Sequence, residues 1–412
     1  MLNTADENCL SLVEKRFCAI DCAMDIILNL LTVYFLLPLY ICLGLILVFF
    51  NIPSNFYISL FALAGLGTFI VLVSSLFYSQ VGVRLKDIYG FISANKKHRQ
   101  VAYLTCILIV MLGPIDVLLN GFKLADPLSY AELSEYGRFA RHITTMCWIL
   151  IPVAFLFIQK NYIKYLLIAY AIIFPILIID RNRLFMSFFV LIFCMLLTPA
   201  ESSERQLKKS NVPIYFLVVL VILIFAAIGQ FRSGDAFLVE SSGEMFTQGF
   251  FPLSDTFYLL PEGFQQVVLY LTTPQFNFAT IDYNNFINED FLKSQLSPFD
   301  RESFDKYPYA PVLIERFNVG TEFFPWLLYG GLPLVAIAIS ALVFVFIAAV
   351  QLLKKHPNIF TLLIFLRVAY VTLFAGFAPQ FFILLNLGFF LLMMLLWMLS
   401  VSLGGNRPQI SQ

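Results

Sequence analysis

Apolar runs long enough to cross a lipid bilayer recur along this chain of 412 residues, from Met24 to Leu403. A helix that crosses about 30 Å of hydrocarbon at about 1.5 Å per residue needs roughly 20 residues. Hydrophobic residues make up 60% of the sequence and charged residues only 13%, a composition that no soluble domain of this size requires. The sequence therefore predicts an all-α integral membrane protein with about 10 transmembrane helices.

The predicted spans stand on either side of one long polar and aromatic insert. Seven spans are expected within residues 24–230 and three within residues 324–403. The insert between them, residues 231–323, is far longer than most connections, which need only a handful of residues. We expect it to form a large external loop containing short helices. Residues 1–23 should form an N-terminal arm and residues 404–412 a C-terminal tail.

Each expected span follows one apolar run of the sequence. The fifth and sixth spans are short and share the link Arg181-Asn182-Arg183, which predicts a tightly turned helical hairpin. The ten spans are expected at residues 26–50, 56–78, 101–120, 142–158, 164–180, 184–200, 213–230, 324–350, 359–377 and 381–403.

Lysine and arginine residues in the short connections predict the orientation, because cytoplasmic connections carry an excess of both. Most of these residues fall in the N-terminal arm, the C-terminal tail and alternate connections, which places both termini in the cytoplasm. The large loop is then external, and with 13 acidic and five basic residues it is strongly acidic. The short connections on the loop side hold Lys123, Arg138, Arg141, Arg181 and Arg183.

Several kinds of catalytic site are excluded by the residues that the large loop lacks. It contains no histidine and no cysteine, so it offers no histidine-based metal site, no catalytic triad and no disulfide framework. The chain has no phosphate-binding glycine-rich loop and no metal-binding His-Glu pair on a helix. We therefore expect no metal, no cofactor and no nucleic acid among its ligands.

Two arginines in the link between the fifth and sixth spans are the clearest candidate functional residues. Arg181 and Arg183 lie on the predicted external side, against the usual bias of basic residues toward the cytoplasm. A planar guanidinium stays charged and holds phosphate oxygens in a bidentate grip, which suits a lipid-linked diphosphate. Interfacial anchoring or pairing with Asp180 is the alternative. We expect Asp180 to neutralise Arg181, its closer neighbour, and to leave Arg183 available.

The two ends of the large loop supply further candidates near the membrane surface. Arg232 opens the loop and Arg316 closes it, so both are expected to extend the anion site, with Asn318 as another substrate ligand. Glu315 and Glu322 are expected to be partly desolvated, which raises the pKa of a carboxylate and makes it a better base. The alternative is a capped helix start with surface ion pairs. The candidate general bases are Glu315, Glu322, Asp235 and His142.

The large loop is also rich in aromatic side chains, which suit the apolar faces of sugar rings. Tyr307 and Tyr309 are candidate substrate ligands, together with His142, the one histidine near the expected outer surface. Residues 257–271 are expected to form a short amphipathic helix that rests on the membrane. For any single aromatic residue, core packing or lipid contact is the alternative.

One charge deep in a predicted span needs an explanation. Arg367 lies well inside the ninth span, where a charge is unfavourable by about 2.5–3.5 kcal/mol. Two explanations are open: it locks helices together, or it binds a lipid phosphate from within the membrane. The rest of the predicted interior is nearly free of charge, apart from Asp116 near the outer end of the third span.

The sequence resembles the Wzy family of bacterial repeat-unit polymerases in its layout and in short patches. The shared layout is about ten spans, a dominant external loop late in the chain, and arginines at the external ends of spans. One patch is Arg183-Leu184 at the start of a span. The others are Asn318-Val319-Gly320-Thr321, leading to Phe324, and Gly330-Gly331.

The resemblance implies an enzyme of the bacterial inner membrane that acts at the periplasmic face. It implies transfer of the growing glycan from its undecaprenyl-diphosphate carrier to the sugar end of a new lipid-linked repeat unit, without a nucleotide sugar or a metal. External arginines are the functional residues usually proposed in the family, and they correspond here to Arg181, Arg183, Arg232 and Arg316. The expected partners are the undecaprenyl-diphosphate-linked oligosaccharide, the lipid bilayer and a chain-length regulator protein.

Three other activities fit the same layout less well. O-antigen ligases share it, but their pattern includes a histidine in the large loop. Glycosyltransferases that use polyprenyl-phosphate sugars carry acidic residues in a large first external loop, whereas here that link is only residues 51–55. A lipid-linked oligosaccharide flippase predicts a charged central cavity and has no need of the large loop. Transporters usually also have repeated halves, and the sequence shows no internal repeat.

Overall fold

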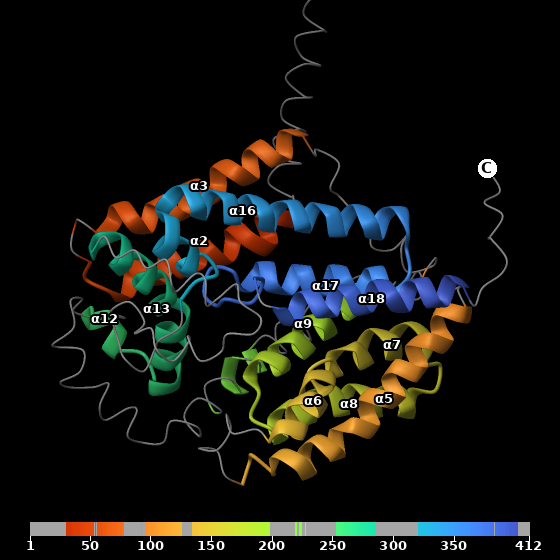
Figure 1. Cartoon of the computed structure of the whole chain (residues 1–412). Coiled ribbons are helices and arrows are strands. Elements are labelled where there is room, and N and C mark those ends of the chain that lie inside the picture. Colours follow the sequence, from red (N-terminus) through yellow and green to blue (C-terminus); the bar gives the residue numbers. More distant parts are fainter. Residues whose placement is uncertain are drawn as a thin grey trace, which may run out of the picture. The chain divides into compact units, whose positions relative to one another are not determined.

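The computed structural model describes an all-helical protein, which confirms the all-α part of the predicted fold class (Figure 1). All the regular elements in the described part of the chain are helices. That part comprises residues 30–77 except 53 and 55, residue 92, residues 96–125, 134–197, 219, 220, 222–224, 227, 253–284 and 320–402 except 383.

Five helical stretches are long and apolar enough to cross a membrane, which supports a membrane protein. They are Thr32–Phe49, Phe56–Leu76, Lys97–Asn120, Gly137–Phe157 and Gly330–Lys355. Shorter apolar helices cover Asn161–Leu177, Ile359–Phe374 and Asn386–Ser402. The total of about ten spans stays a prediction, because the remaining helices are short and the predicted span 213–230 lies mostly outside the described residues.

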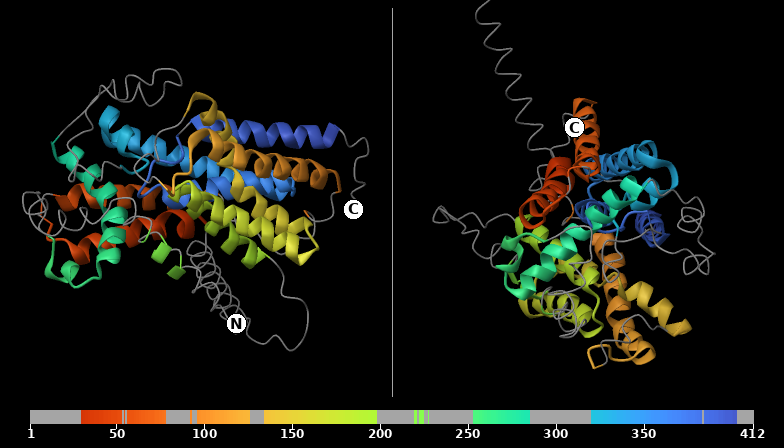
Figure 2. Two further views of the ribbon diagram at one scale, coloured as in Figure 1. Left: turned by 90° about the horizontal axis from the view of Figure 1, so that it is seen from below. Right: turned by 90° about the vertical axis from the view of Figure 1, so that its left-hand side faces the viewer.

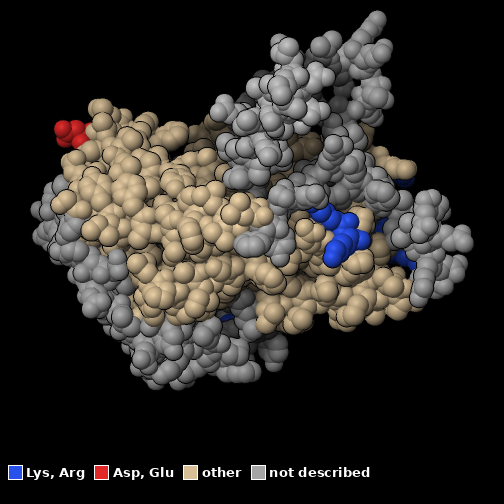
Figure 3. Space-filling view, turned by 90° about the horizontal axis from the view of Figure 1, so that it is seen from above, with Lys and Arg blue, Asp and Glu red and all other residues tan. Residues whose placement is uncertain are grey.

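Large apolar side chains lie on the outside of many helices. Leu118, Ile58 and Leu76 are 83%, 76% and 72% exposed, and soluble proteins rarely expose wide apolar patches of this kind. In Figure 3 the described surface is almost entirely uncharged, and its Lys and Arg side chains are confined to small areas. This surface fits helices that face lipid.

The chain divides into two compact units, each of which is described by itself. Unit 1 comprises Met1–Val83, Leu271–Gln351 and Val371–Ile383. Unit 2 comprises Arg84–Tyr270, Leu352–Tyr370 and Leu384–Gln412.

Unit 1 contains long apolar helices from the beginning and the later part of the chain. A π-helical turn, Thr32–Leu36, leads into α2 (Leu37–Phe49), and α3 (Phe56–Phe77) follows. Most of α16 (Phe324–Lys355) also belongs to this unit. Aromatic contacts join them, because Phe35 packs edge-on against the Phe323 ring and Tyr34 contacts Phe346 of α16.

A pair of glycines bends α16 near its start. Gly331 has φ 65° and ψ −162°, a conformation that residues with a Cβ strongly resist. Its neighbour Gly330 is also non-helical, with φ −140° and ψ 16°. The first turn of α16 is therefore set off from the apolar stretch Gly330–Lys355, which is long enough to cross the membrane.

Unit 2 holds a run of consecutive helices and parts of the last two. The run is α5 (Lys96–Asn120), α6 (Glu135–Thr144), α7 (Leu150–Phe157), α8 (Asn161–Leu177) and α9 (Arg181–Leu197), and the last two are α17 (Ile359–Phe374) and α18 (Leu384–Ser402). Helices α7, α8 and α9 lie side by side and are coloured yellow to green in Figure 2.

The two ends of unit 2 carry different side chains. At one end, the His98 ring packs edge-on against Phe360, and the Tyr103 hydroxyl donates to the carbonyl oxygen of Phe157 at 2.9 Å. At the other end, α5 finishes, α6 begins, and a turn joins α8 to α9. Most of the charged contacts of this unit lie at that second end.

The long insert contains a helix that the sequence analysis placed wrongly. Residues 257–271 were expected to form one short helix, but α12 (Asp255–Tyr258) ends before Pro261 and α13 (Glu262–Asn284) begins after it. Helix α13 has 23 residues, so it is not one of the short helices predicted. Residues 272–279 of this helix are buried in unit 1, where Phe276 packs on Phe50 with ring centres 4.5 Å apart. The amphipathic pattern predicted a helix that ends at residue 271, whereas α13 continues to Asn284, where tertiary packing outweighs the local pattern.

Candidate functional site

The predicted hairpin between the fifth and sixth spans is present as the turn between α8 and α9. Asp180 precedes the first residue of α9, and its Oδ1 accepts a hydrogen bond from the backbone N–H of Arg183 at 3.1 Å. Its own N–H donates to the carbonyl oxygen of Pro175 in α8 at 2.9 Å. The carboxylate thus caps α9, and the turn places Arg181 and Arg183 in the first turn of that helix.

This turn holds a strained residue. Ile179 has φ 54°, and it is the one described residue other than glycine with a positive φ. A β-branched side chain resists this conformation by about 1–3 kcal/mol, so the surroundings must hold it in place. Ile179 is 3% exposed, and its burial supplies that constraint. Strain of this kind is often found at functional sites.

Arg183 is buried and contacts three polar partners. Its Nη2 donates to the backbone oxygen of Arg141 at 2.9 Å, and its Nη1 lies 3.3 Å from Oγ1 of Thr144. Its Nε lies 2.8 Å from Oδ2 of Asp180, an ion pair that lacks the alignment of a hydrogen bond. The expectation that Asp180 neutralises Arg181 and leaves Arg183 available is therefore wrong. Residues three apart share a helix face, so Asp180 reaches Arg183 rather than its immediate neighbour.

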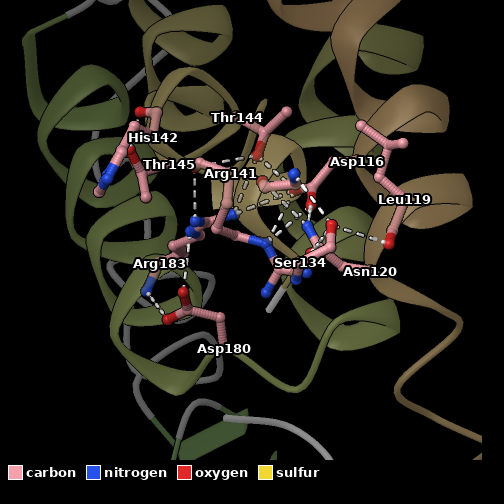
Figure 4. Close-up of polar contacts among 11 residues, drawn as sticks. Asp116, Leu119, Asn120, Ser134, Arg141, His142, Thr144, Thr145, Asp180 and Arg183 are labelled. Atoms are coloured by element: carbon pink, nitrogen blue, oxygen red, sulfur yellow. Dashed lines mark hydrogen bonds and ion pairs between the residues drawn. The ribbon is translucent and has the colours of Figure 1, made fainter. Parts of the chain in front are cut away.

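Asp116 of α5 is the centre of the buried network, with no exposed surface (Figure 4). The Nε of Arg141 lies 2.9 Å from both of its carboxylate oxygens. The Thr144 hydroxyl donates at 2.6 Å, and Nδ2 of Asn120 donates at 2.7 Å. Nη1 of Arg183 lies 4.0 Å from the same carboxylate. A buried carboxylate with this many donors is well satisfied.

The charges within this network are balanced. The carboxylates of Asp116 and Asp180 match the guanidinium groups of Arg141 and Arg183. Arg141 and Thr144 are three residues apart on α6, and Asp116 and Asn120 four apart on α5. This spacing is the sequence signal that the analysis missed, because the two pairs had to be recognised as facing one another.

Arg181 is the more accessible arginine of the α8–α9 turn. Its Nη2 donates to the hydroxyl of Tyr270 at 3.2 Å, and its guanidinium carbon lies 4.8 Å from the centre of the Tyr270 ring. Tyr270 belongs to α13, within the long insert, and both residues are in unit 2. The contact therefore brings the insert to the start of α9, and its geometry is that of a cation–π pair.

A second contact reaches the start of α9 from α17. The Tyr370 hydroxyl lies 3.0 Å from the backbone oxygen of Asn182 and 2.5 Å from its side-chain oxygen. Tyr370 is completely buried, and Asn182 stands between Arg181 and Arg183 in the chain. Neither Tyr370 nor Asn182 was singled out from the sequence, because a buried tyrosine in an apolar run has the pattern of a core residue.

His142 lies next to the network but apart from its centre. It follows Arg141 on α6 and is exposed, and its backbone oxygen accepts a hydrogen bond from the Thr145 hydroxyl. Figure 4 shows its side chain on the side of α6 away from Asp116. His142 thus remains a candidate ligand at the edge of the site rather than a member of the ion-pair network.

Glu322 lies in unit 1, just before α16, and is buried. Its carboxylate accepts hydrogen bonds from the successive backbone N–H groups of Gln380, Phe381 and Phe382, at 2.7 Å from Phe381 and 2.9 Å from Phe382. Its own N–H donates to the carbonyl oxygen of Ala375 at 2.9 Å. The side chain therefore fastens the start of α16 to the chain after α17, an arrangement different from the surface ion pairs considered as the alternative.

Replacing Glu322 should change how stability depends on pH. Burial raises the pKa of the Glu322 carboxyl above its ordinary value of 4.5, and the three N–H donors act in the opposite direction. The folded protein then holds this proton to a higher pH than the unfolded chain does. The resulting stability is fully present below pH 4.5 and is lost as the pH rises through the folded pKa.

We therefore expect Glu322→Gln to flatten the pH dependence of the melting temperature measured in detergent. The exposed Asp255, replaced by asparagine, serves as the control and should leave the profile unchanged. A Glu322→Gln profile that follows the wild-type profile at every pH would contradict the assignment of this titration to Glu322.

Six of the candidate residues from the sequence belong to parts of the chain that the structure does not describe. Arg232, Tyr307, Tyr309, Glu315, Arg316 and Asn318 lie outside the described residues. Their predicted roles at the ends of the large loop stay predictions. Within the described ranges, no group of three or more His, Cys, Asp or Glu side chains is arranged to hold a metal ion.

Comparison with other proteins adds no relative from which a role can be transferred. No family model, no curated protein and no solved structure matches this chain.

Proposed function

We propose that this protein polymerises oligosaccharide repeat units carried on undecaprenyl diphosphate, at the periplasmic face of a bacterial inner membrane. The apolar helices of the two units support a membrane protein. The resemblance of the sequence to Wzy polymerases supplies the reaction and the carrier. A chain-length regulator is the protein partner that this activity calls for.

One contact carries most of the support from the structure. Arg181 at the start of α9 is held by Tyr270 of the long insert, through the ring face and a hydrogen bond of 3.2 Å. A cation suited to phosphate and a segment rich in aromatic residues are thereby brought together. A polymerase needs this combination, because it must bind a diphosphate and a glycan that are joined to one another.

The chemistry of the proposed reaction explains why an arginine is useful there. An acceptor hydroxyl attacks the anomeric carbon of the growing glycan and loses its proton to a base or to water. The new glycosidic bond forms as the bond between that carbon and the diphosphate oxygen breaks. Negative charge grows on the departing diphosphate, so a guanidinium beside it lowers the barrier.

A flippase for the same lipid-linked oligosaccharide is the second candidate, favoured by one observation. Asp116, Arg141 and Arg183 form a buried network among the helices of unit 2, and charges buried in a membrane protein often mark transport pathways. Against this, each of the two guanidinium groups of the network is already paired with a carboxylate, so the positive and negative charges balance. An O-antigen ligase is less well supported, because the insert lacks the histidine of that family's pattern.

Deletion of the gene tests the proposal directly. Surface polysaccharide extracted from the deletion strain is separated on a silver-stained gel and compared with that of a complemented strain. We expect the ladder to collapse to lipid core plus one repeat unit, because export and ligation survive. Loss of every repeat unit would contradict a polymerase. Accumulation of the lipid-linked unit at the cytoplasmic face of the membrane would then indicate a flippase. Accumulation at the periplasmic face would indicate a ligase.

A further inference from the structure

Helix α17 is buried along most of its length except at a single arginine. From Ile359 to Tyr370 every residue is buried except Arg367, which is partly exposed. Its neighbours Leu366 and Val368 have no exposed surface. Arg367 therefore lies among apolar neighbours on a buried helix, and its side chain keeps some exposed surface.

Arg367 has hydrogen-bonding capacity that the described residues leave unused. Its Nε donates to Oδ1 of Asn386 in α18 at 2.8 Å, and its guanidinium carbon lies 5.6 Å from the centre of the Tyr370 ring. In the described part of the chain, its two terminal nitrogens have no acceptor and no carboxylate lies within ion-pair distance. All three described ion pairs involve other arginines.

The contrast with the other buried arginines is informative. Arg141 is matched by Asp116, and Arg183 by Asp180, as expected of arginines that hold helices together. Arg367 is instead oriented by the neutral amide of Asn386, which fixes the guanidinium without neutralising it. A positive charge within a span is unfavourable by about 2.5–3.5 kcal/mol, so this position suits an anion brought by a ligand.

The position of Arg367 relates it to the candidate site. Tyr370 lies one turn further along α17, and its hydroxyl contacts Asn182 at 3.0 and 2.5 Å. Asn182 immediately follows Arg181 at the start of α9. All these residues belong to unit 2. Arg367 of α17 is therefore linked through Tyr370 to Asn182, the residue beside Arg181 at the start of α9.

We infer that Arg367 binds one phosphate of a lipid-borne diphosphate, which Arg181 contacts from the start of α9. The identity of the lipid carrier rests on the proposed function. Two guanidinium groups from separate helices match the two phosphates of a diphosphate better than the single phosphate of an ordinary phospholipid. Arg367 thereby determines specificity for the carrier as well as affinity.

Binding of a short-chain polyprenyl diphosphate to the full-length protein in nanodiscs tests this inference. Arg367→Gln should weaken binding about tenfold or more, the effect of losing hydrogen bonds from a charged group. Arg367→Lys should also weaken it, because an ammonium lacks the planar fork. Lys164→Gln is the matched control, since it removes a cation that packs 4.2 Å from the centre of the Phe155 ring, and binding should be unchanged.

Three results would overturn the inference. The first is unchanged affinity for the diphosphate in Arg367→Gln. The second is an equal loss of binding to phosphatidylglycerol, which would make the position a general phospholipid site. The third is an equal loss of binding to inorganic pyrophosphate, which would make the lipid irrelevant. If Arg367→Gln does not fold, Arg367→Lys keeps the charge and decides the question, and wild-type affinity in that variant overturns the inference.

The melting temperature without lipid separates ligand binding from a structural role. A purely helix-locking arginine would make Arg367→Gln less stable than the wild type while both Arg367→Gln and Arg367→Lys keep wild-type affinity for the diphosphate, which overturns the inference. Removal of a charge that has no ion-pair partner among the described residues should instead leave stability unchanged or raise it. The polymerase proposal and the present inference can fail separately. An intact polysaccharide ladder in the deletion strain contradicts the polymerase but does not contradict diphosphate binding by Arg367. A lost ladder with normal binding in Arg367→Gln overturns only the present inference.

Discussion

Asp116→Asn should lower the free energy of unfolding by about 3–5 kcal/mol, the largest effect on stability that we expect from one substitution. Asp116 is completely buried and is the acceptor for Arg141, Thr144 and Asn120. An asparagine of the same shape keeps one oxygen as an acceptor but removes the negative charge. The guanidinium of Arg141 is then left buried and unneutralised, which is more unfavourable than the loss of one hydrogen bond.

Denaturant unfolding of the purified protein in detergent measures this loss. Ser75→Ala is a suitable control, because Ser75 is also buried but bonds only to the backbone of its own helix, at 2.7 Å from the oxygen of Val71. That control should lose about 1 kcal/mol or less. A wild-type midpoint for Asp116→Asn would show that the ion pair with Arg141 does not stabilise the fold.

A double substitution isolates the pair itself. Asp116→Leu with Arg141→Met replaces both charges by apolar groups, and buried pairs replaced in this way often leave stability nearly unchanged. We expect the double variant to be more stable than Arg141→Met alone. The difference between the double variant and the sum of the single variants then gives the coupling between the two residues.

Helix positions followed from the sequence because hydrophobicity and turn chemistry are local properties. The apolar runs predict where helices lie, and Arg181-Asn182-Arg183 was recognised as the site of a tight helical hairpin, although these three residues already belong to α9. The burial of α13 was not recognised. Its second half contains Thr272, Thr273 and Asn277, polar residues that are nearly or completely buried, and single-sequence patterns treat such residues as exposed.

The partners of the charged residues could not be obtained from the sequence in the same way. Pairing between Asp116 on α5 and Arg141 on α6 depends on how two helices face each other. The expected pairing of Asp180 with Arg181 rested only on their distance along the chain. In the folded hairpin, residues three apart lie on the same side of the helix, so Asp180 contacts Arg183. Tertiary geometry therefore changes which arginine is the better candidate for binding substrate.

Arg181→Ala should abolish polymer formation while the protein still accumulates in the membrane. The side chain is partly exposed at the start of α9 and its guanidinium rests on Tyr270, so its removal should leave the buried network intact. Removing one donor that stabilises developing charge typically reduces a rate by about 10²–10³-fold. On a silver-stained gel, the ladder of surface polysaccharide should collapse to lipid core plus one repeat unit.

Variants at neighbouring positions make the Arg181 result interpretable. Arg138→Ala removes an exposed arginine of α6, near the same end of unit 2, and should leave the ladder unchanged. Tyr270→Phe keeps the ring beneath the guanidinium but removes the hydrogen bond of 3.2 Å, so a partial shortening of the ladder is expected. A normal ladder in Arg181→Ala, with normal protein levels, would exclude Arg181 from the reaction.

Replacing Arg183 should have a different effect from replacing Arg181, although the two residues are only two positions apart in the sequence. Arg183→Ala would leave Asp180 without its ion-pair partner and remove donors to Thr144 and to the backbone of Arg141. We expect the amount of folded protein to fall together with the polymer. Arg183→Lys should fail nearly as badly, because one ammonium cannot reach three partners in different directions. Loss of polymer at normal protein levels therefore distinguishes an arginine that acts on substrate from one that holds the site together.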